Sequence, residues 1–359
     1  MKLLCLASLC VAAASAFSPP TSLNLRVRSL PHPSVTAHRS AQPVHPRHIV
    51  ARPVLPRWSM SDAAQTAAVD GSSAPMGNIL VLDHVNINHE KGRHDLLKAF
   101  YFDCLGCAVD PRKEENLAKG KKTLWANAGI NQFHLPEADE AQVFAGTIVL
   151  QYKSLYKVLA RLQAAPAVLS GTKFAFKPDA SDPNIFHVTC PWGNSFELCG
   201  DAGASKDPRG TQPGETSEPL GMPELRVDVP FGSDMGVIER FYNDVMAAPT
   251  TRSGSTVTVH CGEGQKLVFM QRGEGEAVAH SDYHVSMYID DLPGAFARAE
   301  ERGLIFVNPR FKRKARTLDE AIDQCMFRVV DMGVIQLEHE IRATKTRTGE
   351  PYKSCPFDQ

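Results

Sequence analysis

The sequence predicts an α+β fold built from a strand–helix–strands unit that recurs four times. Short segments rich in β-branched residues flank single amphipathic helices, which is the first observation. The second is that this order restarts after a Gly/Pro/Ser/Thr-rich stretch at 201–221. The third is a repeated motif, since FYFD at 100–103 matches FYND at 241–244. Together they indicate an internal repeat of about 120 residues, each copy containing two units.

Each element follows from its local pattern. Residues 79–87 alternate apolar and polar positions, which predicts a strand. Residues 94–104 carry Leu96, Leu97, Phe100 and Tyr101 on one helical face, which predicts a helix. The same criteria predict further strands at 123–126, 131–135, 143–152, 174–177, 186–190, 195–199, 225–229, 256–260, 267–270, 284–289, 327–330 and 334–339. They predict further helices at 155–163, 237–246 and 292–302.

Composition limits the class of protein. The 359 residues are 43% hydrophobic and 22% charged, which is ordinary for a globular protein. No apolar run beyond the N-terminus is long enough to predict a membrane-spanning helix. The net charge of −1 hides an asymmetry, because residues 1–61 hold seven Lys and Arg but no acid. The remaining 32 basic and 40 acidic residues give the body a charge of −8, which argues against nucleic-acid binding.

The N-terminal segment has the chemistry of a targeting sequence. Residues 1–16 read as a signal peptide with an apolar core and an Ala14-Ser15-Ala16 cleavage site before Phe17. Residues 17–60 are rich in Ser, Pro and Arg and free of acid, as transit peptides are. This combination resembles the bipartite presequence of algae with secondary red plastids. We therefore expect a plastid (chloroplast) location, with a secreted protein as the alternative.

The body is expected to contain two domains, at 79–200 and 222–342, joined by the linker at 201–221 and followed by a tail at 343–359. Its motifs resemble the vicinal oxygen chelate superfamily of glyoxalases, dioxygenases and fosfomycin-resistance proteins. The carrying residues are LDHV at 82–85, FY at 100–101, CLG at 104–106, WGNSFEL at 192–198, YHV at 283–285 and DDL at 290–292. The resemblance implies paired βαβββ units, forming a U-shaped mixed sheet around a cavity in each domain.

The resemblance also implies a metal site in the first domain. Its ligand positions lie on the first and last strand of each unit, which assigns His84, His134 and Glu197, with Glu197 also catalytic. The fourth position falls on Ala145 or Gly146, which cannot ligate. Two imidazoles and a carboxylate suit Zn, Ni, Mn or Fe(II) and leave coordination positions open for a substrate. The alternative is that the two histidines are hydrogen-bonded interior residues and Glu197 a cavity-edge acid.

The second domain offers a weaker site. Its first-strand position is Arg226, which would not hold a cation, whereas His284 fits the opening strand of its second unit. The closing strand presents Gln336, Glu338 and Glu340 on one face, and spacing alone does not fix the register. We take His284 and Glu338 as this second site.

Two functions remain open from the sequence. The first is a metal-dependent enzyme acting on a small oxygenated molecule, either a glyoxalase-like lyase or isomerase or a ring-cleaving dioxygenase. The second is a non-catalytic protein of the plastid that binds a ligand or serves as a scaffold. The missing fourth ligand and the degenerate second domain favour this alternative. A small-molecule partner is expected in the first case, and the sequence is compatible with a homodimer.

Overall fold

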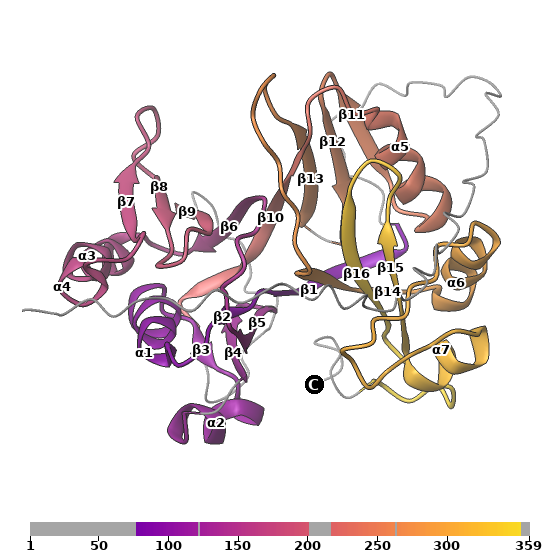
Figure 1. Ribbon diagram of the computed structural model, residues 1–359, viewed down its shortest axis with the longest axis horizontal. Helices are drawn as coiled ribbons and strands as arrows, with labels where there is room; N and C mark the ends of the chain where they lie inside the picture. The colour runs from indigo at the N-terminus through magenta and orange to yellow at the C-terminus, as the bar shows by residue number, and fades with distance from the viewer. Residues whose placement is uncertain (1–76, 121–122, 201–216, 263, 353–359) are drawn as a thin grey trace, which may run out of the picture. The chain divides into compact units, whose positions relative to one another are not determined.

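The four predicted units follow one another along the chain (Figure 1). The structure is a computed structural model that describes residues 77–120, 123–200, 217–262 and 264–352, all within one compact unit, Ser59–Gln359. The predicted leader at 1–60 lies outside the described residues, as do most of the linker and the end of the tail. Among the described helices, none has the length and apolarity needed to cross a membrane.

The first unit comprises β1 (Ile79–Asn86), β2 (His89–Glu90), α1 (His94–Leu97), η1 (Lys98–Cys104), β3 (Ala108–Val109), η2 (Pro111–Lys113), α2 (Glu114–Ala118), β4 (Thr123–Ala128) and β5 (Asn131–Ala138). The second comprises β6 (Gly146–Tyr152), α3 (Tyr156–Ala164), α4 (Pro166–Leu169), β7 (Ala175–Pro178), β8 (Ile185–Thr189) and β9 (Ser195–Gly200). The third comprises β10 (Pro219–Val229), α5 (Met235–Arg240), η3 (Phe241–Val245), β11 (Thr250–Ser253), β12 (Thr256–His260) and β13 (Lys266–Gln271). The fourth comprises β14 (His284–Ile289), α6 (Leu292–Glu301), α7 (Leu318–Gln324), β15 (Met326–Asp331) and β16 (Gln336–Ala343).

Every strand and helix predicted between residues 79 and 339 has a counterpart in the structure. The α+β class is therefore confirmed. The helices α2, α4 and α7 were not predicted, although α7 begins with a capping box in which Thr317 and Glu320 each satisfy the other's backbone N–H. The predicted linker also ends earlier than expected, because β10 already begins at Pro219.

The strands form two mixed eight-stranded sheets (Figure 1). Sheet I has the order β15-β16-β14-β1-β5-β4-β3, with β2 added beside β5, and sheet II has the order β11-β12-β13-β10-β6-β9-β8-β7. In each unit the first and last strands pair in parallel, and the first strands of two units meet antiparallel at the centre of each sheet. Sheet I thus joins the first and fourth units, and sheet II the second and third. Each sheet combines one unit from each repeat copy.

The two copies nevertheless retain separate aromatic clusters. Tyr101 of η1 packs on Phe133 of sheet I at 5.2 Å and lies 6.2 Å from Phe196 of sheet II, so the first copy shares one apolar core across both sheets. In the second copy, Tyr242 of η3 packs on Phe269 at 5.5 Å and on a β16 residue. The repeated Phe-Tyr motif therefore has the same role in both copies, which is to fix the helix against strands of its own copy.

Candidate metal centre

A β-bulge in β1 turns two polar side chains toward the same face of sheet I. The pairing of β1 with β14 shifts register between Leu82 and His84, so Asp83 is the extra residue. Without the bulge, Asp83 and His84 would project to opposite faces, because strand side chains alternate. Instead, His84 Nδ1 donates a hydrogen bond to Asp83 Oδ2 at 2.8 Å, and both side chains are buried.

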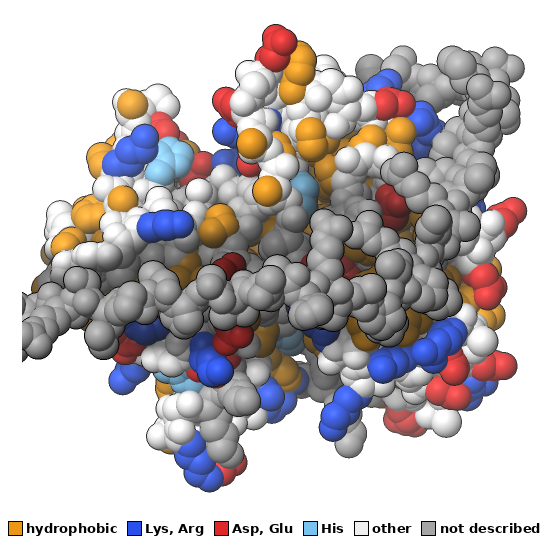
Figure 2. All heavy atoms as spheres, viewed as in Figure 1, with side chains coloured by type: hydrophobic (Ala, Val, Ile, Leu, Met, Phe, Trp, Pro, Cys, Tyr) orange, Lys and Arg blue, Asp and Glu red, His pale blue; other side chains and the backbone are white. Residues whose placement is uncertain are grey.

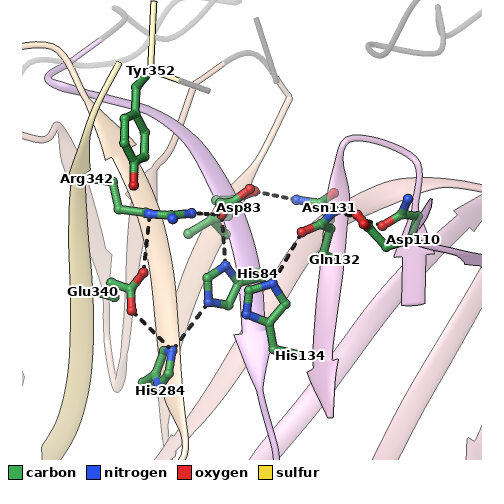
Figure 3. A network of polar contacts seen from close by, with 12 residues as sticks. Asp83, His84, Asp110, Asn131, Gln132, His134, His284, Glu340, Arg342 and Tyr352 are labelled. Atoms are coloured by element: carbon green, nitrogen blue, oxygen red, sulfur yellow. Dashed lines mark hydrogen bonds and ion pairs between the residues drawn. The ribbon is translucent and has the colours of Figure 1, made fainter. Parts of the chain in front are cut away.

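This contact orients the His84 ring. A carboxylate only accepts, so the proton lies on Nδ1 and the lone pair on Nε2. Nε2 points to His284 Nε2 of β14 at 3.3 Å, and His284 Nε2 lies 3.7 Å from Glu340 Oε2 of β16 (Figure 3). Ligand atoms bound about 2.1 Å from one cation are separated by about 3.0–3.4 Å, so the spacing is close to that of a metal site. His84, His284 and Glu340 therefore form a buried group that could hold a metal ion.

The charge states of the last two residues suit ligands. Burial lowers the pKa of His284 well below its ordinary value, and Arg328 adds to this effect, so the imidazole is neutral. Burial raises the pKa of Glu340, but Arg342 and Arg328 outweigh it and lower the pKa overall, so Glu340 is a carboxylate. Neutral imidazole and ionised carboxylate are the forms that bind metals.

Two arginines share the carboxylates around the site. Arg342 contacts Asp83 Oδ2 at 2.9 Å and Glu340 Oε1 at 3.2 Å, while Arg328 bridges Glu340 and Glu338 (Figure 3 shows Arg342). Three carboxylates and two guanidiniums leave this network one negative charge. A divalent cation would therefore meet a favourable, though partly neutralised, environment.

His134 is brought to the site, but its ring stacks on His84 rather than completing the ligand group. The ring centroids of His134 and His84 are 3.6 Å apart, and Trp125 stacks on His134 at 4.2 Å. His134 Nε2 donates to Gln132 Oε1 at 3.3 Å. Burial lowers the pKa of His134 well below its ordinary value, and His84 adds to the effect. The stack holds the plane of His84, and the group of clustered ligand atoms is formed without His134.

Glu338, taken from the sequence as the partner of His284, is engaged elsewhere. It stands directly opposite His284 in the parallel register, but its carboxylate accepts from Asn308 Nδ2 at 2.7 Å and pairs with Arg328. Glu340, two residues further on the same face, is the carboxylate that reaches His284. On the closing strand it is therefore Glu340, not the expected Glu338, whose carboxylate lies near His284.

Glu197 is not brought to the histidines. It lies on β9 in sheet II, where Arg226 of β10 binds both carboxylate oxygens, at 2.7 and 3.0 Å. Arg226 also pairs with Glu224, and these contacts raise its pKa. The sequence predicted that His84, His134 and Glu197 share one domain and one sheet. In the structure, His84 and His134 lie in sheet I, whereas Glu197 lies in sheet II. The resemblance assigned Glu197 as a metal ligand, but in the structure its carboxylate binds the Arg226 guanidinium.

A cavity of about 380 Å³ lies in sheet II and shares no lining residue with the histidine group. Its polar lining comes from Thr147, Lys177, His187, Thr189 and Ser195. Figure 2 shows basic and histidine side chains gathered over β7 and β8. His187 in this lining bonds Asp179 Oδ2 through Nε2 at 2.8 Å, and the converging ligand atoms of the histidine group mark the candidate metal centre.

Known structures similar to this chain have low TM-scores and low sequence identities. No family model matches the sequence, and no curated protein matches it. A glyoxalase I variant from Zea mays is similar with a TM-score of 0.45 and 15% identity, over 75% of this chain and 94% of that chain. The 2,3-dioxygenase LapB from Pseudomonas sp. KL28 has a TM-score of 0.28 and 14% identity, over 77% and 98%. A 2,2',3-trihydroxybiphenyl 1,2-dioxygenase from Sphingomonas wittichii strain RW1 has a TM-score of 0.28 and 14% identity, over 74% and 90%. By their names these similar structures are one glyoxalase I variant and two dioxygenases, each at most 15% identical to this chain.

Proposed function

We propose that this chain is a metal-dependent enzyme acting on a small molecule with two neighbouring oxygen atoms. The observation that supports it is the convergence of His84, His284 and Glu340, in which two Nε2 atoms 3.3 Å apart face a carboxylate. Glyoxalase-like lyase or isomerase chemistry and ring-cleaving dioxygenation both belong to this proposal. A divalent ion of the Zn, Ni, Mn or Fe(II) type held by three ligands would supply Lewis acidity at open coordination positions.

The protein's own groups prepare this site. Asp83 fixes the Nδ1–H tautomer of His84 and keeps its Nε2 lone pair directed inward. The stack of His134 and Trp125 limits rotation of the His84 ring. Arg342 contacts both Asp83 and Glu340, so one guanidinium connects the candidate ligand Glu340 with the residue that orients His84.

Metal content and turnover test the proposal together. We expect the wild type to bind an ion at this centre. The His284→Ala and Glu340→Gln variants should lose that ion, and the Glu338→Gln variant should retain it. Glu338→Gln is a matched control, because it removes one negative charge from the same strand. Glu338 also contacts Arg328, as Glu340 does. Turnover of hemithioacetal and catechol substrates should follow the metal. Equal metal content in Glu340→Gln and wild type, with the fold intact, would sink the proposal.

A second candidate is a non-catalytic ligand-binding protein. It is supported by the Arg226–Glu197 pair on sheet II and by the nearby cavity, whose lining includes Lys177. Here we expect small carboxylates to raise the melting temperature of the wild type but not of Lys177→Ala. Lys173→Ala serves as the control, because Lys173 does not line the cavity. Metal-free protein with such a response would favour binding over catalysis.

We further propose that the protein acts in a plastid. The support is the signal-like segment 1–16, with Phe17 directly after its cleavage site, followed by the acid-free stretch 17–60. Residues 1–60 fused to a fluorescent protein should reach the plastid of an alga with a secondary red plastid. The Phe17→Ala fusion should be diverted to the secretory route. Secretion of both fusions would contradict the plastid proposal.

A further inference from the structure

A second group of potential ligands lies on three elements of the first unit. His89 belongs to β2, His94 begins α1, and Glu137 belongs to β5. One ligand atom from each lies within 4.8 Å of the other two. His89 stands directly opposite Glu137 in the parallel β2–β5 pairing, so both side chains leave the same face.

The turn between β2 and α1 brings His94 back to this pair. Gly92 adopts a φ of 76°, a left-handed conformation that favours glycine. Its N–H donates to Glu137 Oε1 at 2.7 Å, and the Lys91 N–H donates to the Ala138 carbonyl at 2.8 Å. The turn is thus fastened to β5 by hydrogen bonds, and the Glu137 carboxylate is held in place.

Both histidines carry buried ring nitrogens that the fold does not satisfy. His89 is 1% exposed, and neither of its ring nitrogens has a hydrogen-bond partner among the described residues. The same holds for both ring nitrogens of His94. A neutral imidazole offers one donor and one acceptor, and buried polar groups are nearly always paired in folded proteins. The two rings lie side by side, with centroids 5.1 Å apart. A bound cation would accept the lone pairs of their nitrogens.

We propose that His89, His94 and Glu137 bind a divalent transition-metal ion of the Zn²⁺ class. Two imidazoles and a carboxylate are ligands that Zn²⁺ accepts at about 2.0–2.2 Å, and small side-chain rotations would bring the three atoms to that distance. The ion would tie β2, α1 and β5 together. This site is separate from the His84 group and does not depend on the proposed function.

The surroundings keep His89 in the neutral form that binds a metal. Burial lowers the pKa of His89 to about 4, and the neighbouring His94 lowers it further. Glu137 and the carbonyls of Pro136 and Leu135 act in the opposite direction but do not outweigh burial. His89 is therefore a neutral ligand at pH 7. The Glu137 carboxylate acts on His89, whereas the Arg328 guanidinium acts on His284. The Trp192 ring lies 6.1 Å from His89 and encloses the site, with its Nε1–H donating to Glu90 at 3.3 Å.

Cobalt binding to the untagged full chain tests this proposal. Co²⁺ is the probe because it takes the place of Zn²⁺ at such ligands and absorbs visible light. In the His284→Ala background, which removes the other candidate centre, we expect one Co²⁺ per chain by equilibrium dialysis. That ion should be lost in His284→Ala/His94→Ala and in His284→Ala/Glu137→Gln. The amide oxygen introduced by Glu137→Gln would still accept from the Gly92 N–H, so this second variant preserves the turn.

Controls separate the two sites and the two proposals. His284→Ala/His260→Ala should keep the ion, because His260 lies outside both ligand groups and contacts Thr251. Co²⁺ should also quench Trp192 fluorescence in Trp58→Phe/Trp125→Phe, in which Trp192 is the remaining tryptophan, but not when His94→Ala is added. Folded His284→Ala protein that binds no Co²⁺ would overturn this inference, because water alone would then satisfy the rings. If His284→Ala keeps one ion and His94→Ala binds none, the ion belongs to the His89 site. That result would support this inference and contradict a metal at the His84 centre.

Discussion

The Nε2 atoms of His84 and His284 face each other across 3.3 Å, although the two residues are 200 positions apart in the chain. His84 belongs to the first repeat copy and His284 to the second, and they meet because β1 and β14 pair at the centre of sheet I. The candidate centre therefore requires both copies. Neither copy alone contains the strands that position its ligands.

Asp83 should control the affinity of this centre without binding the ion. Asp83→Asn replaces the carboxylate that accepts from His84 Nδ1 and pairs with Arg342. Loss of such a partner typically weakens metal binding by about 10- to 100-fold. Competition with a chromophoric chelator would measure it. Asp110→Asn is the control, since Asp110 is an equally buried aspartate that pairs with Arg112 instead. Equal affinities for Asp83→Asn and wild type would show that the Asp83–His84 contact is irrelevant to the ion.

His134 should contribute stability rather than a ligand. His134→Ala removes the ring between Trp125 and His84 and should lower the free energy of unfolding by about 1–2 kcal/mol. His134→Phe keeps the stack and should restore most of that loss. Both variants should retain the metal stoichiometry of the wild type, as measured by elemental analysis. Metal loss in His134→Phe would instead make His134 a ligand, as the sequence suggested.

The sequence predicted the units well because their signals are local. Alternation marked β1 and β14, and the Phe-Tyr motif marked both η1 and η3. The pairing of units is a non-local property, which no local pattern encodes. His84 and His284 were therefore both selected, but for different sites. The sequence order of the copies suggested that units of one copy share a sheet, and the structure joins units of different copies.

Two details of the site lay beyond strand alternation. Glu338 and Glu340 have the same parity, so a period of two cannot distinguish them. Arg328 contacts both carboxylates, and what separates them is that Asn308 binds Glu338 whereas Glu340 lies 3.7 Å from His284. The bulge at Asp83 was equally hidden, because alternation would have placed Asp83 away from His84.

Glu197 should matter for stability but leave the histidine centre intact. Glu197→Gln removes the charge that Arg226 binds through two nitrogens, while Glu224 still contacts that arginine. We expect a loss of about 1–3 kcal/mol in the free energy of unfolding by urea, because a half-buried guanidinium loses its strongest partner. Glu224→Gln is the matched control and should cost less. A drop in metal content in Glu197→Gln would contradict this assignment and restore the site first expected from the sequence.

His339 should make stability depend on pH in a defined window. It is fully buried on β16, where its Nδ1–H donates to the Leu337 carbonyl and its Nε2 accepts from Tyr242 Oη, each at 2.7 Å. Burial lowers its pKa to about 4, against about 6.5 in the unfolded chain. The unfolded state therefore binds more protons between these values. The contribution is complete above pH 6.5 and is lost as pH falls toward 4.

This difference is worth about 3 kcal/mol over the whole window. Urea unfolding at a series of pH values should show wild-type stability falling from pH 6.5 to 4. His339→Gln keeps a polar side chain at the same place but cannot titrate, so its curve should fall by about 3 kcal/mol less. Burial also lowers the pKa of the partly exposed His260, though less than that of His339, so His260→Gln should change the curve less than His339→Gln. Parallel curves for His339→Gln and wild type would mean that His339 is not held neutral by its burial.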